Sequence, residues 1–211
     1  MLNYYAARAA EYDRVYLKPE RQADLRQIEA WLPGRLAGRC VLEVACGTGY
    51  WTRLIAPVAT RVRALDAAPQ TLEIARGRVP AGSVDFVVGD AYALPPCSPP
   101  FDAAFAGFWW SHVPRARLRE FLRSLHACLA PEARVVFLDN RYVPGSSTPV
   151  SPPDEAGDTW QLRRLDDGST HRVLKNFPTE AQLSEAVDDL ATYVRFTAWD
   201  HYWALEYAVA S

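Results

Sequence analysis

Short apolar runs alternate along the chain with longer stretches in which apolar residues recur at helical spacing. Runs of four to seven apolar residues, rich in β-branched and aromatic side chains, are typical of strands buried on both faces. Strands that alternate with helices in this way predict an α/β domain around a mainly parallel sheet. The first five predicted strands are 40–44, 61–65, 85–88, 102–108 and 134–138.

The last part of the chain has a different pattern. Thr179 and Gln182 have capping-box spacing and predict the start of a helix that ends near residue 190. The apolar runs 193–199 and 202–209 follow, separated by only two residues, so we expect them to pair as antiparallel strands. Before them, two short runs flank Asp166, Asp167 and Gly168, which predicts a β-hairpin.

Composition limits the possible functions. The 211 residues, 49% of them hydrophobic, suffice for one well-buried domain but not for two large ones. A formal net charge of −2 provides no broad attraction to nucleic acid or anionic lipid. The four cysteines form no C-x-x-C pair, so neither a metal site nor a disulfide is indicated. No signal peptide or membrane span is recognisable, and we expect a cytoplasmic protein.

A glycine loop directly after the first predicted strand is the most informative motif. Glu43, Ala45, Gly47 and Gly49 are spaced two residues apart. Glycines at such a place let the backbone turn sharply and approach a ligand closely. A dinucleotide fingerprint would require a third small residue at the position of Thr52, so NAD binding is disfavoured.

This stretch resembles the first motif of the class I S-adenosylmethionine-dependent methyltransferases, with Ala45 where that family usually has glycine. The resemblance implies a Rossmann-like fold, a mainly parallel seven-stranded sheet with an antiparallel C-terminal strand, and here an inserted β-hairpin. It also implies S-adenosyl-L-methionine as the cofactor and a small-molecule acceptor, with O- or N-methylation favoured. Two alternatives are methylation of a protein or nucleic acid, and a catalytically silent module that binds S-adenosylmethionine.

Two acidic residues continue the resemblance. Asp66 ends the second predicted strand, where a carboxylate can accept hydrogen bonds from both ribose hydroxyls. Asp90 and Ala91 follow the third strand, where the family holds the adenine ring. As single residues, either acid could instead cap a helix or turn. The implied cofactor site comprises Glu43, Ala45, Cys46, Gly47, Gly49, Asp66, Ala67, Asp90, Ala91 and Phe108.

The acceptor site is expected beyond the same strand ends. Trp109, Trp110 and His112 follow the fourth strand, and ligands in open parallel sheets bind at that edge. We predict that His112 is a general base and that both tryptophans contact the acceptor, although one or both could belong to the core and His112 could bond the helix start. Further predicted contacts are Asn140 and Arg141 after the fifth strand, and Tyr5 and Tyr12 from an N-terminal helix that covers the site.

We therefore predict one methyltransferase domain over residues 1–211. Residues 1–32 would form a helical cover, and residues 139–178 a loop and β-hairpin insertion. The expected partner is a small-molecule acceptor, without nucleic acid, membrane or metal, and the protein would be a monomer or homodimer.

Overall fold

The computed structural model describes residues 9–94 and 97–210, and its centre is a seven-stranded sheet with the order β3-β2-β1-β4-β5-β9-β8. β9 is antiparallel to β5 and β8, and the pairs among β1 to β5 are parallel. The predicted Rossmann-like fold class is thus confirmed. The strands are β1 Cys40–Val44, β2 Arg61–Asp66, β3 Asp85–Val88, β4 Phe101–Gly107, β5 Leu129–Asn140, β8 Ala191–Ala198 and β9 Tyr202–Val209.

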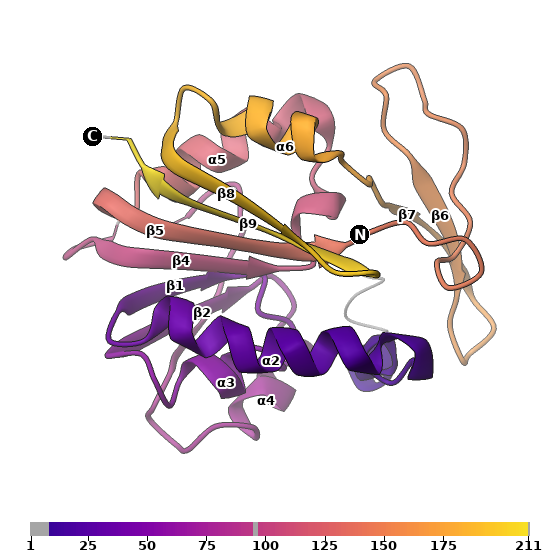
Figure 1. The fold of residues 1–211 in the computed structure, drawn as a ribbon. Helices are drawn as coiled ribbons and strands as arrows, with labels where there is room; N and C mark the ends of the chain where they lie inside the picture. Colours follow the sequence, from indigo (N-terminus) through magenta and orange to yellow (C-terminus); the bar gives the residue numbers. More distant parts are fainter. Residues whose placement is uncertain (1–8, 95–96, 211) are drawn as a thin grey trace.

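Helices cover both faces of this sheet. Figure 1 shows α5 and α6 on one face and α2, α3 and α4 on the other. Within residues 9–94 and 97–210, the α-helices are α2 Gln22–Leu36, α3 Thr52–Ile55, α4 Pro69–Arg76, α5 Leu118–His126 and α6 Glu180–Val187. The 3₁₀ segments in the same part of the chain are η1 Ala9–Tyr16, η2 Pro19–Arg21, η3 Trp110–His112 and η4 Arg115–Arg117.

The core lies in two layers because successive strand side chains point to opposite faces. Val41 packs in the layer that contains the α2 residues Leu25 and Ile28. Its neighbour Leu42 packs in the other layer, with Phe121 of α5. Burial on both faces explains why β1 reads as a continuous apolar run rather than an alternating one.

Two helix boundaries differ from those that a proline in the sequence favours. A proline ordinarily ends a helix, but α2 continues through Pro33 to Leu36. Leu32 and Leu36 are both fully buried, and this burial offsets the backbone hydrogen bond that a proline removes. Pro114 is suited to the first turn of a helix, but the 3₁₀ turn η4 follows it and α5 begins only at Leu118.

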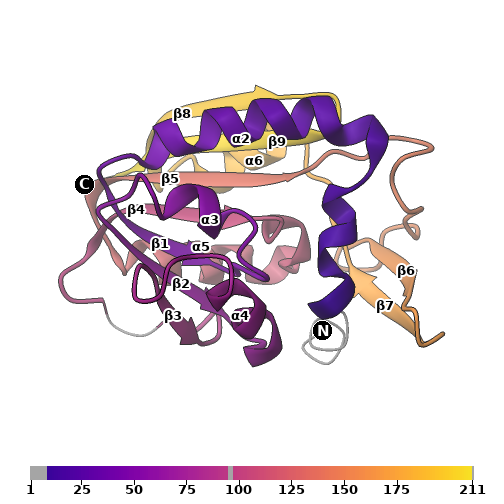
Figure 2. The same cartoon turned by 90° about the horizontal axis from the view of Figure 1, so that it is seen from below.

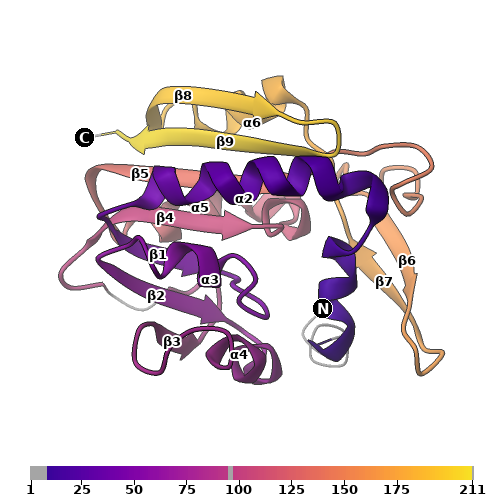
Figure 3. The same ribbon diagram turned by 60° about the horizontal axis from the view of Figure 1, so that its bottom comes forward.

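An inserted pair of strands extends from the domain beyond the sheet. β6 Trp160–Arg164 and β7 Thr170–Leu174 are antiparallel and form the predicted hairpin, called the ribbon below. Figures 2 and 3 show η1 and the ribbon side by side, beyond the C-terminal ends of β1, β2 and β4. These two segments therefore enclose the edge of the sheet at which a ligand is expected.

Candidate functional site

The loop after β1 has the conformation that its small residues predict. Ala45, Gly47 and Gly49 all have positive φ angles, of 55°, 56° and 77°. A Cβ atom at Gly49 would lie 2.9 Å from the Cβ of Ala75 in α4, so this glycine allows close packing of the loop on the helix. Gly47 instead borders a cavity, and Ala45 adopts the left-handed conformation despite its side chain.

Asp66 ties this loop to the end of β2. One carboxylate oxygen accepts a hydrogen bond from the backbone N–H of Gly47 at 2.8 Å. The other accepts from the N–H of Ala68 at 2.9 Å and from the hydroxyl of Thr71 at 3.1 Å. Burial raises the pKa of Asp66, and these hydrogen bonds oppose that effect. The carboxylate is held rigidly at the cavity wall, where it can accept further hydrogen bonds from a diol.

The cavity at this place, called the glycine-loop cavity below, has a volume of about 490 Å³. Arg117 lies flat against one wall, with its guanidinium carbon 3.6 Å from the centre of the Tyr92 ring. A cavity of this size with an aspartate, a glycine loop and apolar walls suits a nucleoside-containing ligand. Its lining includes Ala45, Gly47, Leu65, Asp66, Ala67, Gly89, Asp90, Ala91, Tyr92, Phe108, Trp109 and Arg117.

Three residues of the predicted cofactor site are absent from that lining. Gly49 packs on α4, while Glu43 and Cys46 are buried behind the loop. Glu43 is only 1% exposed, and neither carboxylate oxygen has a hydrogen-bond partner of good geometry among the described residues. Burial raises the pKa of Glu43 to about 8; the nearby Thr52 hydroxyl opposes this shift, and the charge of Asp66 adds to it. These three residues therefore support the loop rather than line the cavity.

A second cavity, called the ribbon cavity below, lies between the N-terminal segments, the end of β5 and the ribbon, and has a volume of about 500 Å³. Tyr12, Phe108 and His112 line both cavities. The two spaces therefore meet at these three side chains. Other residues that line the ribbon cavity are Arg14, Lys18, Arg21, Asn140, Ser146, Ser147, Gln161, Arg163, Lys175 and Phe177.

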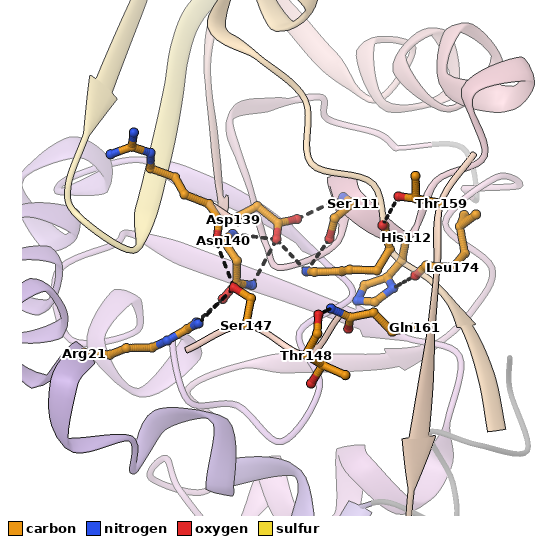
Figure 4. Close-up of polar contacts among 12 residues, drawn as sticks. Arg21, Ser111, His112, Asp139, Asn140, Ser147, Thr148, Thr159, Gln161 and Leu174 are labelled. Carbon is orange, nitrogen blue, oxygen red and sulfur yellow. Dashed lines mark hydrogen bonds and ion pairs between the residues drawn. The ribbon is translucent and has the colours of Figure 1, made fainter. Parts of the chain in front are cut away.

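His112 has a defined tautomer at this junction. Its Nδ1 lies 2.6 Å from the carbonyl oxygen of Leu174, as drawn in Figure 4. Because a carbonyl oxygen can only accept, Nδ1 carries the proton and Nε2 bears the lone pair of the neutral ring. The backbone of η3 and the ribbon thus orient a buried imidazole with its basic nitrogen defined.

A buried polar network supports the floor of the ribbon cavity (Figure 4). Lys175 donates hydrogen bonds to Asp139 at 2.9 Å and to the hydroxyl of Ser111 at 2.6 Å. Asp139 also accepts from the backbone N–H groups of Ser111 and Asn140. Burial lowers the pKa of Lys175 to about 8, although the charge of Asp139 opposes the shift. This network holds β5, η3 and the ribbon together.

The predicted acceptor residues have different positions. Tyr12 and His112 lie at the junction, and Asn140 lines the ribbon cavity. Trp109 lines the glycine-loop cavity instead of the ribbon cavity, in edge contact with Tyr92. Tyr5 lies outside the described residues.

Two of these predictions need correction. Trp110 is 4% exposed and packs edge-on against Phe137 and Trp203, because the η3 turn directs it into the core. Arg141 is exposed, and its guanidinium donates to the carbonyl of Trp199. Neither residue lines the ribbon cavity or the glycine-loop cavity.

The basic residues of the ribbon cavity were missed at the sequence level. Lys18 and Arg21 come from the N-terminal segment, whereas Arg163 and Lys175 come from the ribbon, about 140 residues later. Only the fold brings these segments together. The available signal was weak: two basic residues, Lys18 and Arg21, beside a predicted helix start, and basic residues within a predicted hairpin.

Over residues 9–94 and 97–210, no group of three or more His, Cys, Asp or Glu side chains is arranged to hold a metal ion. In the same part of the chain, no helix is both long and apolar enough to cross a membrane.

Comparisons with known proteins agree with this geometry. Residues 41–132 match a family described as a methyltransferase domain. The demethylmenaquinone methyltransferase of Renibacterium salmoninarum is 30% identical over 174 residues, which cover 79% of this chain and 68% of that protein. The malonyl-[acyl-carrier protein] O-methyltransferase of Serratia marcescens is 31% identical over 127 residues, covering 59% of this chain and 44% of that protein. This chain thus spans less than half the length of the Serratia enzyme.

A solved structure is similar over nearly the whole chain. The DhpI-SAM-HEP complex has a TM-score of 0.80 and 30% sequence identity, and the match covers 98% of this chain and 94% of that one. Sequence, fold and the position of the glycine-loop cavity therefore lead to one assignment. The chain belongs to the class I S-adenosylmethionine-dependent methyltransferases.

Proposed function

We propose that this protein transfers a methyl group from S-adenosylmethionine to a small molecule held in the ribbon cavity. One observation carries the proposal: the glycine-loop cavity and the ribbon cavity meet at Tyr12, Phe108 and His112. A cofactor in the first cavity and an acceptor in the second would then face each other across this junction.

The residues of the glycine-loop cavity fit the family's cofactor. Asp66 would accept hydrogen bonds from the ribose hydroxyls, and Asp90 with the backbone of Ala91 would hold the adenine. Gly47 leaves room for a close approach by the amino-acid part of the molecule. When bound, the cofactor supplies a methyl carbon activated by its sulfonium group.

The protein's own contribution is alignment, exclusion of water and acceptance of a proton. Phe108 and Tyr12 form an aromatic boundary between the cavities, which favours a fixed approach of the acceptor. His112 would receive, at Nε2, the proton that an acceptor hydroxyl or amine loses as it becomes methylated. The hydrogen bond from Nδ1 to Leu174 would stabilise the resulting imidazolium.

The name of one relative, which refers to demethylmenaquinone, supports a small acceptor, and the name of another refers to a malonyl group carried on a protein. We further propose a single domain in which residues 1–32 cover the site and residues 139–178 form an insertion. The protein would act in the cytoplasm as a monomer or homodimer and would not bind nucleic acid. Methylation of a macromolecule and a silent binding module are the alternatives.

Cofactor binding tests the first half of the proposal. S-adenosylmethionine or S-adenosylhomocysteine at about a hundred times Kd should stabilise the folded protein by roughly 2.7 kcal/mol. Asp66→Asn should weaken binding at least about tenfold, since hydrogen bonds to a charged group contribute roughly 1.5–3 kcal/mol. Thermal shift and calorimetry measure both effects, and the unfolding midpoint of the ligand-free variant shows whether the loop is intact. A shift with NAD and none with either S-adenosyl compound would refute the assignment.

Transfer itself is tested separately. Incubation of the protein with methyl-labelled cofactor and fractionated metabolites, read by mass shift, should yield a methylated small molecule. Cofactor binding without any methylated product from metabolites, but with labelled protein or nucleic acid, would favour the macromolecular alternative.

A further inference from the structure

The ribbon cavity has a strong excess of positive charge. Among the described residues, its lining includes six cationic side chains and two carboxylates, Glu11 and Asp166, and one of the six cations, Lys175, is paired with the buried Asp139. Both carboxylates are committed to Arg14: Asp166 through two hydrogen bonds of 2.7 and 2.6 Å, and Glu11 at 3.5 Å. The six cationic residues are Arg14, Lys18, Arg21, Arg163, Arg164 and Lys175.

Arg21 is the most informative of them because it is buried without a counter-charge. It is 3% exposed, and its guanidinium donates only to neutral groups. These are the hydroxyl of Ser146 at 2.9 Å, the side-chain carbonyl of Asn140 at 2.9 Å and the hydroxyl of Ser147 at 3.4 Å. Figure 4 shows Arg21 reaching toward Ser147 and Asn140. Among the described residues, no carboxylate forms an ion pair with Arg21 within 4.0 Å, whereas buried charges in proteins are normally paired.

Lys18 places a second cation beside Arg21. Its ammonium group donates to the backbone carbonyl of Ser146, again a neutral partner. Burial lowers the pKa of Lys18 and the charge of Arg21 lowers it further, whereas the charge of Glu20 opposes the shift. The acid next in sequence, Glu20, is exposed and does not line the cavity, and its carboxylate accepts from the Ser146 hydroxyl at 2.6 Å. Two like charges thus adjoin one cavity wall, and the acid that interacts with both of them, Glu20, lies outside the lining on the other side of the Ser146 hydroxyl.

The position of this pair relative to the junction defines the shape of the ligand. Lys18 and Arg21 line only the ribbon cavity, whereas His112 borders both cavities. A group bound by the two cations is therefore separated from the point where the cavities meet. We infer that the acceptor has two functional ends: an oxyanion, either carboxylate or phosphate, held by Arg21 and Lys18, and a separate hydroxyl or amine at His112.

This inference rests on the proposed function for the reaction but not for the binding of the anion. It has a chemical consequence for the product. The acceptor's hydroxyl oxygen or amine nitrogen would form a bond to the methyl carbon as the bond between that carbon and the sulfonium sulfur breaks, which leaves S-adenosylhomocysteine. The proton that the acceptor loses goes to His112, and the anchored oxyanion is not altered. The product should therefore keep the acceptor's negative charge and be retained on an anion exchanger as the acceptor is.

Matched pairs of probes test the anion site directly. Glycolate is compared with the uncharged glycolamide, and inorganic phosphate with trimethyl phosphate, by calorimetry at constant ionic strength. We expect each anion to bind at least about tenfold more tightly than its neutral counterpart, because only the anion can neutralise Arg21 and Lys18. The stronger of the two anions identifies the oxyanion class. Equal binding of the charged and neutral probes would overturn the inference.

Variants then locate the binding. Arg21→Gln and Lys18→Gln should each weaken the preferred anion by about tenfold or more. Arg123→Gln removes the same charge from the exposed face of α5 and should leave binding unchanged. If Arg21→Gln does not fold, the Lys18→Gln variant tests the assignment of the anion site, because the side chain of Lys18 is only partly buried. Unchanged anion affinity in a folded Lys18 or Arg21 variant would contradict the assignment.

The two proposals can fail independently. Affinity for S-adenosylhomocysteine is measured in the same samples, and the anion titration is performed with and without it. Loss of cofactor binding with intact anion binding would contradict the methyltransferase proposal alone. Cofactor binding without selectivity for the anions would contradict the anion site alone, as would a methylated product that has lost a negative charge.

Discussion

At the scale of single residues, Glu43 is an ionisable group whose burial costs stability. Its carboxyl group lies behind the glycine loop, and burial raises its pKa from an ordinary value of 4.5 to about 8. The folded protein therefore holds a proton on Glu43 that the unfolded chain has already lost. The contribution of this bound proton to the free energy of unfolding is fully present below the pKa that Glu43 has in the unfolded chain. It is lost as the pH rises toward 8.

Glu43→Gln should remove this pH dependence while keeping the shape of the side chain. The free energy of unfolding of the glutamine variant, minus that of the wild type, should increase from about pH 5 to about pH 8. We expect this increase to be at least the ~1.4 kcal/mol that one pKa unit represents. Urea unfolding of ligand-free protein at both pH values measures the difference. Glu155→Gln, at an exposed position, serves as the control. A stability difference that does not vary with pH would show that Glu43 ionises normally.

His112 is the residue on which the proposed chemistry depends. If it is the base, His112→Ala should lower kcat by roughly 10²–10⁴ and change cofactor affinity little. If it only positions the acceptor, the effect should fall mainly on KM. Steady-state kinetics with an identified acceptor distinguish these outcomes, with His171→Ala on the ribbon as a histidine control outside both cavities. Kinetics identical to the wild type would remove His112 from the site.

The sequence predicted those site residues whose roles follow from their place at a strand end. Asp66 and Asp90 line the glycine-loop cavity because each lies at the C-terminal end of a parallel strand, Asp66 as the last residue of β2 and Asp90 two residues after β3, and such ends share one edge of the sheet. The direction in which a side chain points was not predictable in the same way. Trp109 and Trp110 are adjacent after β4, yet the turn of η3 sends one to a cavity and the other into the core. Arg21 could not be found because its neighbours in the cavity are distant in sequence.

At the scale of elements, local signals were reliable where the chain's own hydrogen bonds decide the structure. α6 begins at Glu180 with the predicted capping box: the Thr179 hydroxyl accepts from the N–H of Gln182, whose side chain accepts from the N–H of Thr179. α2 shows the opposite case, since the proline that should have ended it is overridden by burial of Leu32 and Leu36. Tertiary packing, which the sequence pattern does not contain, decided that boundary.

The capping box permits a prediction for α6. Thr179→Ala should destabilise the protein by about 1 kcal/mol, because one N–H at the helix start loses its acceptor. Thr179→Ser keeps the hydroxyl and should have a much smaller effect. Chemical denaturation of both variants gives the comparison. Equal destabilisation by alanine and serine would mean that the methyl group, and not the hydrogen bond, stabilises this position.

At the scale of the whole molecule, the ribbon cavity depends on two segments that are far apart in the sequence. η1 and the ribbon are joined by Arg14 and Asp166, whose side chains form two hydrogen bonds, and the Asp166 N–H donates to Glu11 at 3.2 Å. Figure 3 shows both segments beyond the strand ends. Such an exposed ion pair contributes little to global stability, but it can hold a local element closed.

Arg14→Ala should therefore loosen the enclosure without unfolding the domain. We expect faster hydrogen exchange of the amides in residues 160–174 and a higher KM for the acceptor, because the wall of the cavity opens more often, with little change in the unfolding midpoint. Asp166→Asn should reproduce these effects, and the double variant should add little to either, since both changes break one interaction. The control is Arg119→Ala, which removes a comparable exposed pair with Asp189 far from the ribbon and should leave its exchange unchanged. Unaltered exchange in the Arg14 variant would show that the buried contacts of Lys175 and Asn176 hold the ribbon in place without the help of this pair.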